Sequence, residues 1–458
     1  MGQFRAGAAE VVITPPVGGP MGGYLERWRE SLGVQDDLYA RALWVEDGET
    51  SIAFVTADVM GFDEGLVAYV RDLLRESLGL PAEQVLLNAS HTHAGPAILP
   101  LRGEGERDES YLEVLARQLV SAVQLARQRA TAARLGAGSA SVQVGINRRE
   151  KTADRGVILG RNPLGPAALY ADVLKVETPE RRPLAVLFSH PAHPIIWGPD
   201  NLNFSADFPG VAARVVQQVL GPETVAMFAQ GCCGDVNPPV VQGTQADVER
   251  VGTLLGAAVL QAWPATPTEA EGTILAVRAE VPLFCEPPPP LEQAEQLVAN
   301  AQERVTRYEI EHRLPGEQRA AQAEYEWARA VLAAARAVED LPAPVCEVSA
   351  VAVNEIAIVG LAAEPFVQVA LEIEERSPFM ETMIWGCTNG LIGYIPTTEA
   401  YPEGGYEVEV AYKRYGTLPL RPESASRLAD EAAELLRQLR QEQLIRSLAG
   451  GQFGGAIP

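Results

Sequence analysis

Four of the five histidines of this chain lie in two short segments, each at the end of an apolar run. QVLLNASHTHAGP holds His91 and His93, and LAVLFSHPAHP holds His190 and His193. In extended backbone, residues i and i+2 point the same way, so His91 and His93 are able to face one cavity. Neutral imidazole is a common ligand of Zn²⁺, and a catalytic zinc takes about three protein ligands and leaves a position for water. The two segments therefore suggest a metal site built from two strand ends.

Two histidines need one or two further donors, and two other strand ends offer them. Glu364 follows the apolar run in AIVGLAAEPF, where the alternative is a helix N-terminal acid stabilised by the helix dipole. Tyr394 follows a glycine in GLIGYIPTT, where the alternative is a packed tyrosine. Asp58, at the end of SIAFVTADV, and Asp235, in CCGDVN, are carboxylates that either orient a ligating histidine or close a strand-end turn.

The elements that must position these residues follow a repeated pattern over the first 280 residues. Short apolar, β-branched runs alternate with loops rich in Gly, Pro, Asn or Asp and with amphipathic helical segments such as GLVAYVRDLLRESLG. This alternation predicts an α/β fold with a mixed, partly parallel sheet flanked by helices. In such sheets, sites collect in the loops that leave the carboxyl ends of the strands.

The proline run CEPPPP, at 285–290, is a stiff break before two long helical patterns. These patterns, about 291–312 and 316–338, are joined by a short connection and predict an antiparallel helical hairpin inserted at about 288–340. Its charged, alanine-rich surface suits a packing or dimer element, so a homo-oligomer is one expectation. A last helix is predicted at about 422–447, and 450–458 is expected to be a flexible tail.

Composition excludes several classes of function. The chain has 458 residues, with 47% hydrophobic and 21% charged residues, as in an ordinary globular protein. Its net charge of -23 disfavours general binding to nucleic acid or to anionic membrane surfaces. We find no signal peptide and no membrane span, and therefore expect a cytoplasmic protein without stable membrane insertion. The five cysteines show no C-x-x-C spacing, and the adjacent Cys232 and Cys233 are expected to be small buried residues.

Several ordered motifs together resemble the neutral, non-lysosomal ceramidases, which are zinc-dependent amidases of sphingolipid metabolism that cleave N-acyl sphingosines. The motifs are ITPPVGGPMGGY, SHTHAGP, INRR, the HP and DNLNFSAD block, QGCCGDVNPP, AAEP and GYIPTTEAY with the following GYE. They run from near the start to about residue 415, which implies that residues 1–458 form one ceramidase-like catalytic domain that includes the hairpin.

The resemblance also implies a role for each matching residue. His193, rather than His190, becomes the second histidine ligand because its distance to Asp207 suits the family's block. His93 becomes an acid/base group beside the reacting carbonyl. Arg148 anchors a polar or anionic group, and Tyr406 donates a hydrogen bond to the oxyanion. The implied zinc ligands are His91, His193, Glu364 and Tyr394.

The departures from the family pattern concern the substrate. Asn237 stands where ceramidases have a serine associated with the polar head of the substrate, and we expect Asn237 to contact substrate. The length leaves no room for the immunoglobulin-like domain that follows the catalytic domain in those enzymes. The expected function is zinc-dependent hydrolysis of an amide in a small-molecule or lipid N-acyl compound. The alternatives are a metal-dependent esterase, lactonase or deacylase acting on a small soluble substrate, and a non-catalytic zinc-binding protein.

Overall fold

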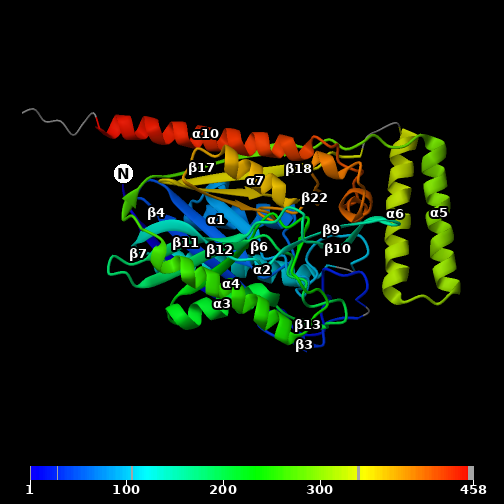
Figure 1. The fold of residues 1–458 in the computed structure, drawn as a ribbon, viewed down its shortest axis with the longest axis horizontal. Coiled ribbons are helices and arrows are strands. Elements are labelled where there is room, and N and C mark those ends of the chain that lie inside the picture. Colours follow the sequence, from blue (N-terminus) through cyan, green and yellow to red (C-terminus); the bar gives the residue numbers. More distant parts are fainter. Residues whose placement is uncertain (1, 28, 105–106, 338–340, 452–458) are drawn as a thin grey trace, which may run out of the picture.

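The computed structural model describes residues 2–27, 29–104, 107–337 and 341–451. Three mixed sheets form the body, helices cover their outer faces, and a helical hairpin stands beside the body at the right of Figure 1. The predicted fold class is confirmed: each of the three sheets contains one parallel pair of strands among antiparallel ones.

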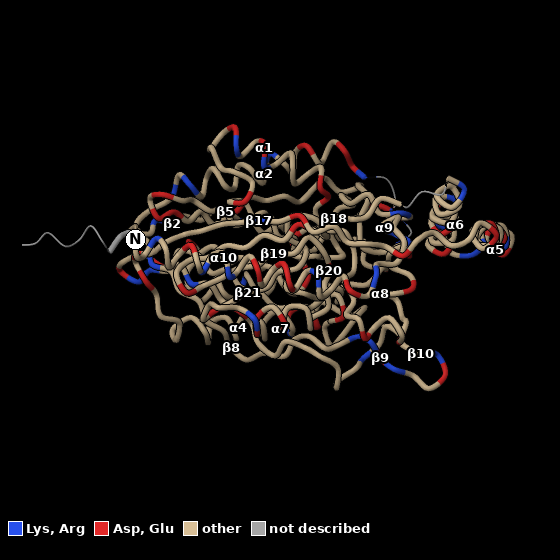
Figure 2. Tube along the Cα trace, turned by 90° about the horizontal axis from the view of Figure 1, so that it is seen from above, with Lys and Arg blue, Asp and Glu red and all other residues tan. Residues whose placement is uncertain are grey.

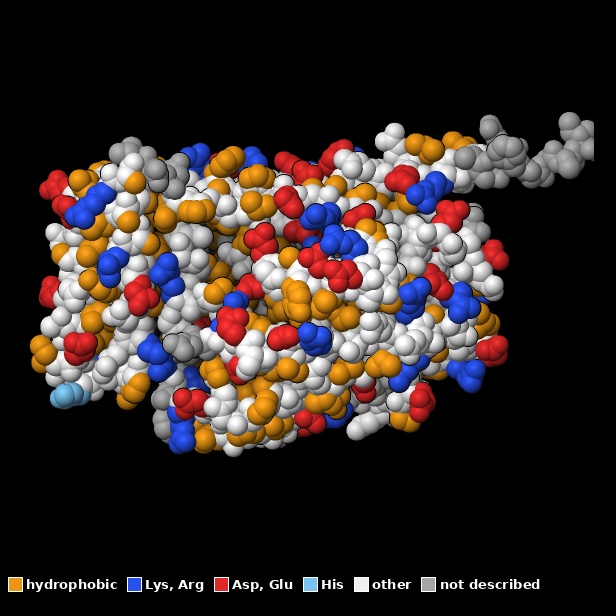
Figure 3. Space-filling model, turned by 180° about the vertical axis from the view of Figure 1, so that it is seen from behind, with side chains coloured by type: hydrophobic (Ala, Val, Ile, Leu, Met, Phe, Trp, Pro, Cys, Tyr) orange, Lys and Arg blue, Asp and Glu red, His pale blue; other side chains and the backbone are white. Residues whose placement is uncertain are grey.

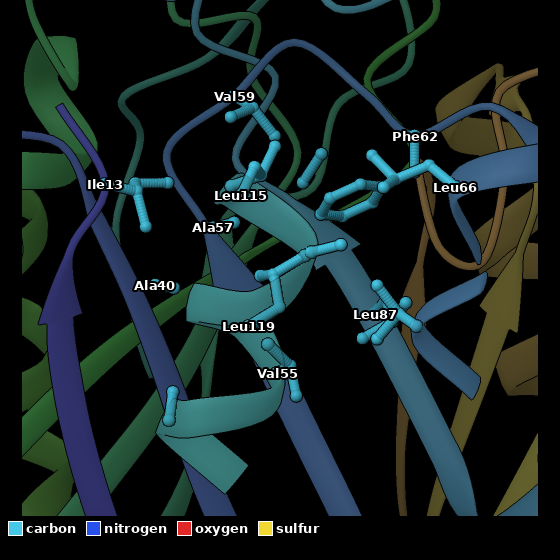
Figure 4. Packing of buried hydrophobic residues seen from close by; sticks show 14 of the residues in the cluster. Ile13, Ala40, Val55, Ala57, Val59, Phe62, Leu66, Leu87, Leu115 and Leu119 are labelled. Carbon is cyan, nitrogen blue, oxygen red and sulfur yellow. The ribbon is translucent and has the colours of Figure 1, made fainter. Parts of the chain in front are cut away.

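The first sheet has the order β6-β5-β4-β2-β7, with β5 and β6 parallel. The strands are Val85–Ala89, Ser51–Ala57, Tyr39–Glu46, Arg5–Val12 and Thr131–Ala132. Helices α1 (Glu64–Leu78) and α2 (Glu109–Gln128) cover one face, and Asp63 and Asp108 cap their amino ends. Figure 4 shows Leu115 and Leu119 of α2 packed on the side chains of this sheet. These predicted helices form because their apolar residues recur on one face.

The second sheet has the order β14-β12-β11-β8, with β12 and β14 parallel. The strands are Val225–Gln230, Pro183–His190, Tyr170–Glu177 and Arg134–Ser141. Helices α3 (Asp207–Leu220) and α4 (Gln245–Ala265) pack on its outer face. Every residue of β14 is buried, as expected of a strand covered on both faces.

The third sheet has the order β17-β18-β19-β21, with β19 and β21 parallel. The strands are Ile274–Pro282, Val345–Val353, Ile356–Leu361 and Glu381–Trp385. Helices α7 (Val367–Arg376) and α10 (Ser424–Gly451) cover it. In Figure 2, α1 and α2 lie on one side of the strands and α4 and α7 on the other.

The inner faces of the three sheets share one core, in which Phe54, Leu187, Met227 and Trp385 are buried. Asn88, the fourth residue of β6, links the sheets at their carboxyl ends. Its Nδ2 donates to the backbone oxygens of Gln230, at 3.3 Å, and Gly386, at 2.8 Å. Its Oδ1 accepts from the backbone N–H of Gln230 at 2.8 Å. The segments that leave the three sheets are thus held together at one point.

The predicted hairpin is present as α5 (Leu291–Ile310) and α6 (Pro315–Ala337). Helix α6 packs on α9 (Tyr412–Tyr415) of the body, and the Trp327 indole N–H donates to the Thr417 carbonyl at 2.8 Å. Helix α10 continues to Gly451, into the first residues of the segment expected to be a tail. The rest of that tail, 452–458, lies outside the described residues. No helix in the described part of the chain is both long and apolar enough to cross a membrane.

Short pairs of strands complete the fold. β9 and β10 form a hairpin joined by β15, and β20 pairs with β22 in parallel. The remaining small pairs are β1 with β16 and β3 with β13. The bounds are Ile146–Thr152, Gly156–Asn162, Val236–Asn237, Glu364–Pro365, Tyr394–Ile395, Gly2–Gln3, Glu271–Gly272, Gly33–Val34 and Asn203–Phe204.

Candidate active site

Four segments that follow strands of the three sheets meet at one place. His91 follows β6, His193 follows β12, Glu364 lies in β20 just past β19, and Tyr394 lies in β22 past β21. Each follows a strand of a parallel pair. Carboxyl ends of parallel strands lie at the same edge of a sheet, which is why residues so distant in sequence come together.

Glu364 bridges the two histidines. Its Oε2 lies 3.2 Å from Nε2 of His91 and 3.1 Å from Nε2 of His193, and all three side chains are buried. Nδ1 of His91 faces the Met60 carbonyl at 2.6 Å, and Nδ1 of His193 faces the Val236 carbonyl at 3.0 Å. A ring nitrogen that donates to a carbonyl leaves the other nitrogen as the bare one, so both Nε2 atoms are free to bind a metal.

His93 lies next to this group but is partly exposed. Its Nε2 is 3.4 Å from Nε2 of His91, and its Nδ1 faces the Gly23 carbonyl at 3.0 Å. One ring nitrogen from each of His91, His93 and His193 lies within 4.8 Å of the other two. Among the described residues, no carboxylate oxygen lies within 4.0 Å of the His93 ring nitrogens, in contrast to the other two imidazoles.

Three tyrosines close one side of the cluster. The Tyr394 hydroxyl lies 3.4 Å from Nε2 of His193, and the Tyr415 hydroxyl donates to Oε1 of Glu364 at 2.6 Å. The ring of Tyr406, at the start of α8 (Tyr406–Glu409), is 5.8 Å from that of Tyr394 between centroids. Tyr415 was missed by the sequence reasoning, although it stands in the tyrosine-rich segment that supplied Tyr406.

Arg148 lies against the cluster with one nitrogen unused. Its Nε donates to Oε1 of Glu407 at 2.8 Å, and its Nη1 reaches Oδ1 of Asn237 at 3.3 Å. Nη1 also lies 3.4 Å from Nε2 of His193. Its Nη2 is buried and has no hydrogen-bond partner among the described residues. An unpaired buried donor is costly, and this one is available to a substrate oxygen.

Glu407 is a second residue that the sequence reasoning missed. Its Oε1 accepts from Arg148 and its Oε2 accepts from Nη1 of Arg149 at 2.8 Å, with all three side chains buried. The carboxylate therefore fixes both arginines of INRR. Glu407 is the acidic residue of GYE, and an acidic residue after a tyrosine is too common in sequences to predict an arginine partner.

The two strand-end aspartates have different surroundings. Oδ2 of Asp58 accepts from the Tyr39 backbone and from Arg41, so Asp58 joins the end of β5 to β4; in the described part of the chain it has no hydrogen bond to a histidine. Asp235 positions the site instead: its carboxylate accepts from Nδ2 of Asn147 at 2.7 Å and from the Val367 backbone at 2.8 Å. The Asp235 carbonyl also accepts from the Arg148 N–H at 2.8 Å.

His190 and Asp207 lie outside the cluster. Nδ1 of His190 faces the Tyr170 carbonyl at 2.8 Å, and burial lowers the pKa of His190 to about 4, so the ring is neutral. Asp207 accepts from the Trp197 backbone N–H at 3.0 Å and begins α3.

Two buried thiols complete the surroundings of His91. Cys233 and Cys387 each place Sγ within 4.8 Å of the other and of a His91 ring nitrogen. The prediction that Cys232 and Cys233 are buried is confirmed. The sequence did not predict that Cys233 lies beside His91, because His91, Cys233 and Cys387 come from three segments that are far apart in the chain.

The electrostatics of the cluster favour a bound cation. Burial would raise the pKa of the Glu364 carboxyl, but the neighbouring His91 and His193 hold it well below its usual range. Burial and the neighbouring imidazoles hold the pKa of His93 well below its usual range. Imidazoles this close cannot all be protonated, because like charges repel strongly in a buried site. Against burial, the neighbouring Cys233 and Glu364 raise the pKa of His193 to about 9, so a metal ion that binds here must displace a proton from this imidazole. Two imidazoles with one carboxylate form a donor set that Zn²⁺ takes in proteins, so the residues present fit that ion.

A cavity of about 470 Å³ lies between the hairpin and the body. Figure 3 shows the surface hollowed between these two parts. Ala320 and Tyr308 line it from the hairpin, and Leu25 and Arg414 line it from the body. The Arg414 guanidinium carbon is 5.8 Å from the centroid of the Tyr406 ring, so Arg414 links the wall of the cavity to the tyrosines beside the cluster.

Solved structures share this fold. Neutral ceramidase from Pseudomonas aeruginosa aligns with a TM-score of 0.73 and 16% sequence identity, over 96% of this chain and 75% of that chain. A structure described as ceramidase complexed with C2 aligns with the same score and identity, over 96% and 76% of the two chains. The mixed α/β fold is therefore the one that these two ceramidase structures have.

The family follows from the sequence match. The model of the neutral/alkaline non-lysosomal ceramidase family, N-terminal, matches residues 4–253, more than half of the 458 residues. The chain belongs to this family. The matched region contains His91, His93, Arg148, His193 and Asn237, whereas Glu364, Tyr394 and Tyr406 lie beyond it.

Proposed function

We propose that the protein is a zinc-dependent hydrolase that cleaves the amide bond of an N-acyl compound of the ceramide type. The observation that carries this proposal is the position of Glu364 Oε2, 3.1–3.2 Å from Nε2 of both His91 and His193. Family membership supports the reaction class. Zn²⁺ in such a site lowers the pKa of a bound water to about 7 and polarises a carbonyl oxygen.

His91, His193, Glu364 and Tyr394 would hold the ion. The phenol of Tyr394 is the weakest match to a ligand, since its nearest cluster contact is the 3.4 Å to His193, but its oxygen faces the same space. Tyr415 would orient Glu364 through the 2.6 Å bond to Oε1. Residues that orient a ligand in this way tune the affinity of a metal site.

His93 would move the proton to the leaving amine. It is the partly exposed member of the three imidazoles, and its Nδ1 is fixed by the Gly23 carbonyl, which leaves Nε2 to exchange a proton. Burial, together with the neighbouring imidazoles, keeps the pKa of His93 low, so His93 is neutral before it takes up that proton. General acid–base transfer by a positioned imidazole contributes about 10²- to 10⁴-fold to a rate.

Arg148 and Tyr406 would hold the reacting end of the substrate. The free Nη2 of Arg148 offers a donor to a polar or anionic oxygen, and Glu407 holds the guanidinium in place for it. Tyr406 would donate to the oxygen on which negative charge develops, which is the interaction that lowers the barrier most. Asn237, bonded to Arg148, would contact the same part of the substrate.

The cavity between the hairpin and the body would take the rest of the substrate. Its volume falls within the range of about 300–1,000 Å³ typical of small-molecule sites. Its walls mix apolar side chains such as Leu25 and Val410 with charged ones such as Arg414 and Glu26. That mixture suits an amphiphilic N-acyl compound.

Metal analysis and turnover test the proposal together. We expect stoichiometric zinc, loss of N-acylsphingosine hydrolysis on chelation, and its return with added Zn²⁺. His91→Ala and His193→Ala should lose both zinc and activity. His190→Gln is the matched control, since His190 also ends a strand yet lies outside the cluster. Zinc-free active protein, or full activity in both alanine variants, would refute the proposal.

A further inference from the structure

The two thiols beside His91 have not been used by the function above. Sγ of Cys233, Sγ of Cys387 and a ring nitrogen of His91 lie within 4.8 Å of one another, and all three residues are buried. Nδ1 of His91 is occupied by the Met60 carbonyl, so Nε2 is the nitrogen left for a metal. The thiols therefore adjoin an imidazole that faces Glu364.

Cys233 is the thiol that is tied to the second histidine segment. Its carbonyl accepts from the Val236 N–H at 2.8 Å, and the Val236 carbonyl accepts from the His193 N–H at 3.1 Å. The next residue, Gly234, donates its N–H to the Pro365 carbonyl at 2.9 Å, directly after Glu364. Cys233 thus has its sulfur close to one proposed ligand and its backbone held against the segments of the other two.

The backbone fixes both thiols relative to the ligand segments. The Cys387 N–H donates to the Ala363 carbonyl at 2.8 Å, and its carbonyl accepts from Ala89 at 3.1 Å. These partners directly precede Glu364 and the His91 loop. Cys387 has φ of 47° and His91 has φ of 67°, which place both in the left-handed region. Such backbone conformations are unfavourable for residues other than glycine and persist where the surroundings hold them, often at functional sites.

We propose that Cys233 supplies a sulfur donor to the same ion as His91, His193 and Glu364, and that Cys387 positions it. This inference rests on the metal centre of the proposed function. As the sulfur–metal bond forms, the thiol releases its proton to solvent. Soft thiolate ligands favour zinc over Mg²⁺, Ca²⁺ and Mn²⁺, which prefer oxygen. The sulfur would therefore set the choice of ion at this centre.

X-ray absorption spectroscopy of the zinc-loaded full-length protein tests the donor directly. Zinc–sulfur distances are about 2.3 Å, whereas zinc–nitrogen and zinc–oxygen distances are about 2.0–2.2 Å. We expect one sulfur scatterer in the unmodified protein and in Cys232→Ser, and its loss in Cys233→Ser. Cys232 is the matched control, because it is the adjacent buried cysteine but packs in another core cluster.

The outcomes separate the two proposals. Zinc bound by nitrogen and oxygen alone would overturn the sulfur donor and leave the metal centre standing. A protein that binds no stoichiometric zinc would overturn both. Replacing zinc by Co²⁺ gives a second readout, a near-ultraviolet sulfur-to-cobalt charge-transfer band in the unmodified protein and in Cys232→Ser. That comparison does not depend on the folding of Cys233→Ser, and absence of the band in the cobalt-loaded protein would contradict the inference.

Discussion

Glu364 and Tyr394 lie directly opposite each other in the parallel pair formed by β20 and β22. The Glu364 backbone N–H donates to the Gly393 carbonyl at 2.9 Å, so the two segments are fixed side by side. One backbone register thus delivers both a carboxylate and a phenol to the same cluster. The pairing explains how residues 30 positions apart become neighbours.

Tyr394→Phe removes only the phenol oxygen, and we expect weaker zinc binding with lower activity. The loss should exceed the roughly 10- to 100-fold cost of removing a residue that merely orients a ligand. Tyr415→Phe is the comparison, since its hydroxyl bonds Glu364 and not the histidines. Zinc competition titrations measure both variants. An equal or smaller loss for Tyr394→Phe would mean that the phenol is no ligand.

His93→Gln should lower kcat by about 10²- to 10⁴-fold while zinc content stays at the level of the unmodified protein, because the proposed task of His93 is proton transfer. Single-turnover kinetics and metal analysis of the same sample give the two values. Loss of zinc along with activity would instead assign His93 to the ligands, as its 3.4 Å distance to His91 Nε2 permits.

Glu407→Gln should destabilise the fold on the order of 3 kcal/mol, because it leaves two buried guanidinium groups without their carboxylate. Both arginines and Glu407 are buried in the native structure. Glu113→Gln serves as the control: Glu113 pairs with the exposed Arg117, and such pairs contribute about 1 kcal/mol or less. Denaturant unfolding compares the free energy of unfolding of the two variants. Equal decreases would contradict a larger contribution from the buried network.

We expect the buried His190 to make the free energy of unfolding decrease at acid pH. Burial lowers its folded-state pKa from 6.5 to about 4, so the unfolded chain binds a proton that the folded chain refuses. Stability is therefore fully present above about pH 6.5 and is lost as the pH falls toward about 4, by up to about 3 kcal/mol. His190→Gln should flatten this part of the stability curve, measured by unfolding at several pH values. If the variant keeps the pH dependence of the unmodified protein, His190 is not its cause. The zinc content of His190→Gln should equal that of the unmodified protein.

Ala320→Phe should narrow the cavity between the hairpin and the body. We expect kcat/KM for a long-chain N-acyl substrate to fall by about 10-fold, or about 1.4 kcal/mol, with little change for its N-acetyl counterpart. Ala333→Phe, at an exposed position of the same helix, is the control. If both substrates lose activity equally, the cavity does not hold the acyl chain.

The sequence by itself determined the α/β class, the helical hairpin and the strand-end position of the histidines. These follow from local patterns, since apolar periodicity and turn residues act within a few positions of one another. The motif resemblance separated His193 from His190, and the structure brings His193, not His190, to Glu364. Helix α10 runs to Gly451, into the segment expected to be a tail, because two glycines do not by themselves end a helix held by the preceding turns.

Only the tertiary structure decided how the strand ends meet. Glu407 pairs with two arginines, Tyr415 bonds Glu364, and Cys233 lies beside His91. These are contacts between segments about 50–260 residues apart, as in the Arg148–Glu407 separation of 259. No local pattern encodes such distances, because they depend on how three sheets pack around one core and on Asn88 joining their ends. The donor residues can be read from the sequence, but which of them become neighbours depends on how the sheets pack.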